Sequence, residues 1–214
     1  MNSEQIDLLF FEKEKYKQGY KFVAGIDEVG RGPLAGPVVA AAVILPNNPD
    51  LEGVNDSKKL TAKKRELFYE MIKKQALAIG VGIATVEEID DINILQATKL
   101  AMKRALADLS ITPDYLLIDH LTIDDPLPQL GITKGDAKSL TIAAASIVAK
   151  VVRDKIMVEI GIQHQGYGFE KNSGYGTKAH LDGVKKLGYI EGVHRRSFQP
   201  IKSMLQESAQ LSLF

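Results

Sequence analysis

Residues 25–37, GIDEVGRGPLAGP, join two apolar segments through a short turn and so limit the folds open to this chain. The flanking segments, residues 22–29 and 38–45, are expected to be strands, because β-branched residues are frequent and glycine or proline bounds them. The glycines also match part of a dinucleotide-binding fingerprint, but that fingerprint must open a helix. Here Pro37 and a β-branched run follow, which favours an antiparallel strand pair joined by a loop with accessible backbone.

In the rest of the chain, the spacing of apolar residues predicts a mixed α/β sheet flanked by helices. The chain has 214 residues, of which 45% are hydrophobic, enough for one domain with a substantial core. We expect helices at residues 4–19, 60–75, 93–109 and 140–160, with Ser139 or Thr141 capping the last, and strands at residues 76–84 and 115–119. Further helical segments are expected after residue 160.

Composition excludes several classes of protein. The chain has no cysteine, which rules out disulfides and thiolate metal sites. The polar N-terminus does not resemble a signal peptide, and the longest apolar run, residues 38–45, is too short to span a membrane. We therefore expect a cytoplasmic protein without a membrane partner. The net charge is zero, but residues 171–214 carry seven lysines and arginines against three acids, which is compatible with a phosphate backbone as ligand.

Four acids are candidate ligands of a divalent cation. Asp27 and Glu28 end the first strand, Asp119 ends the strand at residues 115–119, and Asp136 precedes the helix at residues 140–160. An isolated acid is usually a helix cap or a salt-bridge partner. The adjacent pair inside GIDEVGRG instead indicates a site for Mg²⁺ or Mn²⁺, which prefer oxygen ligands. Because neighbours in a regular strand face opposite sides, both serve one site only if the strand bends or the ion lies at its end.

Several polar segments are candidates for phosphate or nucleic-acid contact. Arg31 lies in the glycine turn, and Lys58 and Lys59 lie in a loop before a helix, where a simple capped helix start is equally plausible. Tyr175 stands between two glycines, which favours stacking on a sugar or base over a place in the core. Arg195 and Arg196 form a basic cluster that either contacts phosphate or is merely solvated.

Together these segments resemble the ribonuclease HII family. The resemblance runs from about residue 22 to residue 202 and rests on an ordered set of motifs: GIDEVGRGPLAGPVV, NDSKKL, LLID, KGDAKS with ASIVAKVVRD, GYGTKAH and HRRSF. It implies a ribonuclease H-like sheet of five strands with an added C-terminal helical region. It also implies cleavage of RNA–DNA hybrids and of duplex DNA at single embedded ribonucleotides, in ribonucleotide excision repair.

The resemblance assigns roles to individual residues. It implies catalytic and metal-binding roles for Asp27, Glu28, Asp119 and Asp136, with two Mg²⁺ or Mn²⁺ ions bound alongside substrate. The backbone of Gly30, Arg31 and Gly32 would meet the 2′-hydroxyl, and Tyr175 would pack on the neighbouring deoxyribose. Two positions depart from the family pattern: Asn172-Ser173 replace a frequent His-Lys pair, and His120 replaces a small residue.

The last residues match no element of the catalytic fold. Gln210, Leu211, Leu213 and Phe214 resemble the peptide by which bacterial proteins bind the sliding clamp, although a tail that frays or folds back is the alternative. We expect four parts: an N-terminal helix (1–20), a catalytic core (21–160), a helical substrate-binding region (161–205) and a flexible tail (206–214). One active site gives no reason to expect more than a monomer.

Two other functions compete with this interpretation. A nuclease or resolvase acting on DNA alone would have no need to sense a 2′-hydroxyl with the Gly30–Gly32 turn. A non-catalytic nucleic-acid module recruited by the clamp would have no need for four acids, which repel phosphate in the absence of metal.

Overall fold

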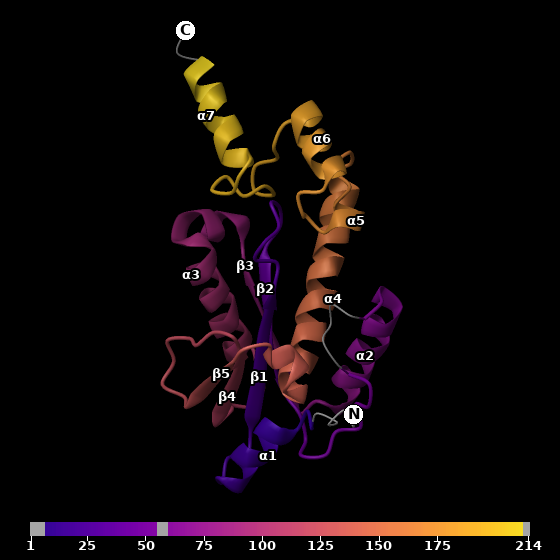
Figure 1. Ribbon diagram of the computed structural model, residues 1–214, viewed down its shortest axis with the longest axis vertical. Coiled ribbons are helices and arrows are strands. Elements are labelled where there is room, and N and C mark those ends of the chain that lie inside the picture. Colours follow the sequence, from indigo (N-terminus) through magenta and orange to yellow (C-terminus); the bar gives the residue numbers. More distant parts are fainter. Residues whose placement is uncertain (1–6, 55–59, 212–214) are drawn as a thin grey trace, which may run out of the picture. The chain divides into compact units, whose positions relative to one another are not determined.

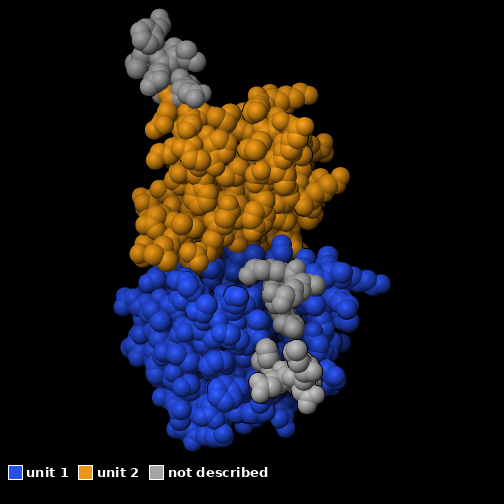
Figure 2. Space-filling model, viewed as in Figure 1, with its two compact units in different colours: residues 1–29, 39–83, 99–151 blue, residues 30–38, 84–98, 152–214 orange. Residues whose placement is uncertain are grey.

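The computed structural model describes residues 7–54 and 60–211, with side chains described up to Gln206. The chain divides into two compact units, shown in blue and orange in Figure 2. Unit 1 comprises residues 1–29, 39–83 and 99–151, and unit 2 comprises residues 30–38, 84–98 and 152–214. Within the described ranges, no helix has the length and apolar character that a membrane crossing requires.

Unit 1 is built on a mixed sheet of five strands, as predicted, in the order β3-β2-β1-β4-β5. The strands are β1 (Val23–Val29), β2 (Val38–Ile44), β3 (Ala78–Ala84), β4 (Tyr115–Asp119) and β5 (Gln129–Ile132). β1 pairs with β2 in antiparallel orientation and with β4 in parallel orientation. Ile26 lies opposite Ile118 in the parallel pair, so the acids that follow them, Asp27 and Asp119, meet at one edge of the sheet.

Two long helices pack closely on this sheet, from opposite sides in Figure 1: α3 (Val86–Ala107) and α4 (Leu140–Gln163). A Cβ atom on Gly25 of β1 would overlap the backbone of Thr141 in α4. A Cβ on Gly82 of β3 would likewise overlap the backbone of Ala101 in α3. These glycines therefore let the helices approach the strands backbone to backbone, and the buried alanines at the start of α4 serve the same close contact.

The N-terminal helix α1 (Phe10–Lys17) covers one apolar cluster of unit 1. Val23, Leu117 and Ile132 supply the strand side of this cluster, and Phe11 and Tyr16 pack on it from α1. Helix α2 (Ala62–Gln75) begins at Thr61, whose side chain accepts a hydrogen bond from the Lys64 amide.

Unit 2 contains the second half of α4 and three shorter helices: α5 (Phe169–Asn172), α6 (Lys178–Leu187) and α7 (Ile201–Leu211). Its core gathers buried side chains from all of these elements and from the loop that follows β1, among them Ala35, Met157, Phe169, Val184 and Ile201. The first residues of the expected tail, 206–211, belong to α7, and residues 212–214 lie outside the described part of the chain.

Three elements differ from the prediction. The N-terminal helix, predicted over residues 4–19, spans Phe10–Lys17 and is preceded by a turn at residues 8–9. The short strand β5 was not predicted from its residues, because four residues that include a glycine give almost no periodic signal. The helix predicted to start at residue 93 begins at Val86, and Asn93 interrupts it with a φ of 68°. The Asn93 carboxamide oxygen accepts hydrogen bonds from the amides of Leu95 (3.0 Å) and Gln96 (3.2 Å), so this residue caps a second helical segment.

Candidate active site

Three acidic side chains come together at the edge of the sheet in unit 1. Asp27 is 4% exposed and accepts hydrogen bonds from the amide of Glu28 (2.7 Å) and the hydroxyl of Ser146. Burial raises the pKa of the Asp27 carboxyl well above its ordinary value, and the charges of Glu28 and Asp119 raise it further. The pairing of β1 with β4 thus brings together carboxylates that are 92 positions apart in sequence, Asp27 and Asp119, close enough to repel.

The fourth predicted acid, Asp136, follows directly after a residue that contacts Asp119. The Gly135 amide donates a 2.6 Å hydrogen bond to Oδ1 of Asp119. Gly135 opens the short 3₁₀ helix η2 (Gly135–Ala137), in which Asp136 is 6% exposed. A Cβ on Gly135 would lie 2.7 Å from Cδ1 of Ile142 and 3.2 Å from the Asp119 carboxylate. A side chain at this position would therefore displace the end of the Ile142 side chain and press on the Asp119 carboxylate.

Glu12 of α1 holds the start of α4, just after this loop. Its Oε1 accepts hydrogen bonds from the hydroxyls of Ser139 and Thr141, both 2.6 Å, and from the Thr141 amide at 3.0 Å. Ser139 in turn accepts a hydrogen bond from the Ile142 amide. Both predicted capping residues, Ser139 and Thr141, thus contribute hydrogen bonds at the start of α4. Glu12 was not predicted, since no local pattern indicates that a residue of an exposed-looking helix reaches a site 127 positions away.

The donor chemistry of this cluster suits a hard divalent cation. Three carboxylates could supply oxygen ligands. Burial, the main cause of the raised pKa of Asp27, and repulsion by Glu28 and Asp119 both disfavour a charge that a bound cation would stabilise. Among the described residues, no group of three or more histidine or acidic side chains is placed so that it could hold an ion as the side chains stand.

In unit 2, a buried arginine shapes the loop that follows β1. Arg195 is fully buried and donates to the carbonyls of Arg31 (2.9 Å), Gly30 (2.5 Å) and Gly36 (2.8 and 3.0 Å). Burial lowers its pKa to about 9, and nearby Arg153 adds to the lowering, so the group is still charged at neutral pH. Its predicted contact with phosphate is corrected here: the guanidinium binds backbone carbonyls and holds the Gly30–Gly36 loop in place.

A second buried arginine, Arg153, joins this loop to the segment that carries Tyr175. It donates to the carbonyls of Pro37 (2.9 Å), Ala35 (3.1 Å) and Ser173 (2.9 Å). The Leu34 amide also donates to the Gly174 carbonyl. Tyr175 itself is 48% exposed, and a Cβ on Gly32 would lie 3.7 Å from its ring. Arg153 was not predicted, because its partners are carbonyls of distant loops and α4 carries several other charged side chains.

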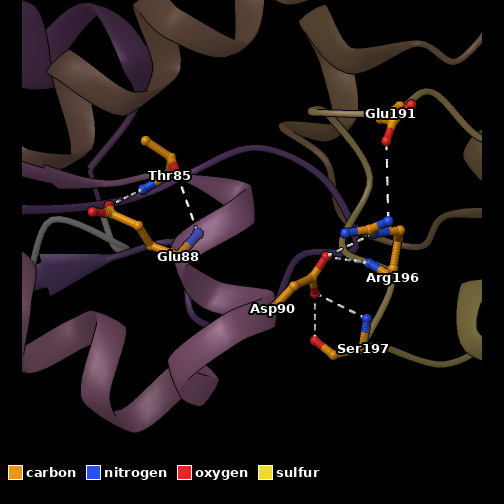
Figure 3. A network of polar contacts seen from close by, with 6 residues as sticks. All are labelled: Thr85, Glu88, Asp90, Glu191, Arg196 and Ser197. Atoms are coloured by element: carbon orange, nitrogen blue, oxygen red, sulfur yellow. Dashed lines mark hydrogen bonds and ion pairs between the residues drawn. The ribbon is translucent and has the colours of Figure 1, made fainter.

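Arg196 is half-exposed and belongs to a polar network (Figure 3). Asp90 of α3 accepts hydrogen bonds from the amides of Arg196 (2.8 Å) and Ser197 (2.9 Å) and from the Ser197 hydroxyl (2.5 Å). The Arg196 side chain lies 3.7 Å from Asp90 and 4.0 Å from Glu191. Of the other predicted contact residues, Lys58, Lys59, Leu213 and Phe214 lie outside the described residues, and the side chains of Gln210 and Leu211 are not described.

Comparison with known proteins identifies the family. The sequence profile of the family Ribonuclease HII matches residues 24–201. The chain belongs to the ribonuclease HII family. Ribonuclease HII of Enterococcus faecalis is 60% identical over 195 residues, which cover 91% of this chain and 76% of that protein. Membership makes the chain an enzyme, a hydrolase with ribonuclease H activity.

Solved structures agree with the family assignment. Ribonuclease H2 from Pyrococcus horikoshii matches with a TM-score of 0.72 and 27% identity, over 87% of this chain and 98% of that one. Ribonuclease HII from Archaeoglobus fulgidus, in its complex with PCNA, matches with a TM-score of 0.69 and 27% identity, over 83% of this chain and 96% of that one. The ribonuclease H-like fold predicted from the motifs is therefore confirmed.

Proposed function

We propose that this protein is a metal-dependent endonuclease that cleaves the RNA strand of RNA–DNA hybrids and nicks duplex DNA on the 5′ side of a single ribonucleotide. One observation carries the proposal. Asp27 and Glu28 lie just before a loop whose backbone, from Gly30 to Gly36, is held by a buried guanidinium, and Asp119 adds a third carboxylate that repels Asp27. Acids that could bind a metal and, at Arg31 and Gly32, accessible backbone that could meet a sugar hydroxyl thus lie close together in the chain.

Asp27, Glu28, Asp119 and Asp136 would hold two Mg²⁺ or Mn²⁺ ions. Such ions, when bound, supply an activated water and stabilise the leaving 3′-oxygen, giving 5′-phosphate and 3′-hydroxyl ends. Neighbouring groups of the chain hold two of these carboxylates in place by hydrogen bonds. Ser146 orients Asp27 by a hydrogen bond, and the Gly135 amide fixes one oxygen of Asp119.

Recognition of a ribonucleotide rests on unit 2. The backbone of Gly30, Arg31 and Gly32 would meet the 2′-hydroxyl, the group that separates RNA from DNA at a single position. The exposed ring of Tyr175, close to Gly32, would pack on the sugar of the next deoxynucleotide. Lys58, Lys59 and Arg196 would contact phosphates, which attract cations irrespective of base sequence.

The chain's role in the cell follows from this chemistry. We propose that it acts in the cytoplasm as a monomer in ribonucleotide excision repair, with the division into helix, core, helical region and tail expected from the sequence. The C-terminal residues Gln210, Leu211, Leu213 and Phe214 would bind the sliding clamp. The complex of the Archaeoglobus fulgidus relative with PCNA supports a clamp as partner.

The test is cleavage of a uniform RNA–DNA hybrid labelled on the RNA strand. The wild-type protein is expected to cut the RNA with Mg²⁺ or Mn²⁺ and to stop when EDTA is added. Asp27→Asn, which keeps the side chain's shape but removes its charge, is expected to lower the rate at least a hundredfold. Cutting in EDTA, or an Asp27→Asn variant of full activity, would overturn the proposal.

A further inference from the structure

Two buried histidines of unit 2 are in direct contact beneath the segment that carries Tyr175. Nε2 of His180 lies 3.0 Å from Nε2 of His194, and both side chains are fully buried. His180 belongs to α6, and His194 lies in the loop between α6 and α7. The rings of Tyr167 and Phe169 surround the pair, with centroids 5.0–6.4 Å from the imidazoles. The apolar surroundings disfavour charge on either ring.

The outer contacts of the pair determine where its protons lie. The Ile190 amide donates to Nδ1 of His194 at 2.8 Å, so this nitrogen is an acceptor and the proton of a neutral His194 is on Nε2. His194 therefore donates to Nε2 of His180. The proton of His180 is then on Nδ1, which lies 2.9 Å from the carbonyl oxygen of Tyr175 and donates to it. Three hydrogen bonds run in one direction, from Ile190 to Tyr175.

From this chain of hydrogen bonds we infer that His180 and His194 are positioning residues, which fix the backbone of Tyr175 so that its exposed ring is already set for the substrate. The inference rests on the proposed stacking role of Tyr175. Ser173 and Gly174 before Tyr175 both have a positive φ, 48° and 83°, so hydrogen bonds hold this part of the backbone, and the His180 bond adds to those of Tyr175 with Asn172 and Thr177. The Tyr175 ring is half-exposed and has little packing of its own to hold it.

Pre-organisation of this kind has a defined kinetic signature. If the Tyr175 ring is mobile in the free protein, substrate binding must order it. The entropy lost in this ordering lowers the affinity for the substrate. The carboxylates of unit 1 are untouched, so the chemical step should keep its rate. We therefore expect a change in KM for a ribonucleotide-containing duplex with little change in kcat.

The experiment is a double-mutant cycle between Tyr175→Ala and His180→Ala, measured on duplex DNA with one ribonucleotide in Mg²⁺. Loss of stacking in Tyr175→Ala is expected to raise KM about tenfold. His180→Ala should raise KM by about threefold to tenfold, with kcat within about twofold of wild type. In the Tyr175→Ala background, the same substitution should change KM by less than about twofold, because the ring through which it acts is gone.

Two further variants separate positioning from general loosening of the fold. His180→Asn keeps an amide that can donate to the Tyr175 carbonyl, so its KM should stay close to wild type. His164→Ala removes a histidine of the same unit that is outside this chain of hydrogen bonds, and it should leave both KM and kcat unchanged. If His180→Ala does not stay folded, as judged by its melting curve, His194→Gln takes its place in the cycle.

Two results would overturn the inference. If the KM effects of Tyr175→Ala and His180→Ala multiply in the double variant, the histidine does not act through Tyr175. If Tyr175→Ala leaves KM unchanged while the wild type still cleaves, the stacking role fails and the inference fails with it, although the nuclease activity stands. Absence of cleavage by the wild-type protein would instead contradict the proposed function itself.

Discussion

The amide of Gly135 donates a 2.6 Å hydrogen bond to the carboxylate of Asp119, which ties the end of β4 to the loop that carries Asp136. A Cβ there would lie 2.7 Å from the end of the Ile142 side chain and 3.2 Å from the Asp119 carboxylate, so it would press on this contact. The hydrogen bond links Asp119 to the residue before Asp136, so these two acids are connected through the backbone and not by a direct contact between their charges.

Gly135→Ala should lower kcat about tenfold or more, because the added methyl group displaces the loop or the Asp119 carboxylate from its place. Steady-state cleavage of an RNA–DNA hybrid measures this. Because the nearest atom is the end of the Ile142 side chain, the melting temperature should fall only by a few degrees. An alanine variant with wild-type kcat would show that the contact between Gly135 and Asp119 has no part in positioning.

Gly25→Ala and Gly32→Ala form a contrasting pair. A methyl group on Gly25 would overlap the Thr141 backbone, so Gly25→Ala should destabilise the fold by about 3 kcal/mol or more. A methyl group on Gly32 would meet only the Tyr175 ring, at 3.7 Å, so Gly32→Ala should melt within about 2 °C of wild type. It should nevertheless lose activity at a single ribonucleotide, because the methyl group obstructs the approach of the sugar. Urea unfolding and cleavage assays test both; equal stability of the two variants would contradict this packing.

Arg195 and Arg196 are neighbours in sequence but should behave differently. Arg195→Lys loses the forked donor geometry that binds three carbonyls, and should cost about 2–4 kcal/mol of stability together with most of the activity. Arg196→Ala should stay stable and should reduce the slope of log affinity against log salt by about 1, if it contacts one phosphate. Binding to duplex DNA across a salt series measures the slope. A stable, active Arg195→Lys variant would contradict the role given to that buried guanidinium.

The histidine pair also predicts how stability depends on pH. Burial lowers the pKa of His194 to about 4 from the ordinary 6.5, with the nearby His180 adding to the shift. Between these two pKa values, His194 binds a proton in the unfolded chain but not in the folded chain. The free energy of unfolding is therefore highest above about pH 6.5 and falls as the pH drops towards 4. Between about pH 6.5 and pH 5 the loss should be about 2 kcal/mol.

Urea unfolding at a series of pH values tests this, with His194→Gln as the comparison. Glu87, Asp90, Glu191 and Arg196 line the same 160 Å³ pocket as His194 and are present in both proteins, so the difference between the two curves isolates the imidazole. The variant should be less stable at neutral pH but should show a flatter profile. Parallel profiles would mean that His194 is not buried in its neutral form.

The sequence was most informative where apolar strands end in acids. β1, β2 and β4 were predicted almost to the residue, because each contains a run of buried apolar side chains, and in β1 and β4 an acid follows that run. The meeting of Asp27 with Asp119 was likewise predictable, since the core fixes where those strands end. β5 and the first turns of α3 were not, because a four-residue strand and a helix interrupted at Asn93 have no clear period.

The polar interior of unit 2 was the least predictable part. Arg195 looks identical to its neighbour Arg196 in the sequence, and only the distant carbonyls of Gly30, Arg31 and Gly36 determine that it is buried. Glu12 and the pair of His180 with His194 pose the same difficulty: their partners are brought together by the fold and leave no local pattern.

The central claim is that the protein recognises one 2′-hydroxyl and cuts beside it. The most direct measurement compares two end-labelled DNA duplexes of identical sequence, one of which carries a single ribonucleotide, incubated with the wild-type protein in Mg²⁺ or Mn²⁺. We predict one nick on the 5′ side of the ribonucleotide, leaving a 3′-hydroxyl upstream, and an intact all-DNA duplex. Cleavage of both duplexes, or of neither, would contradict the account.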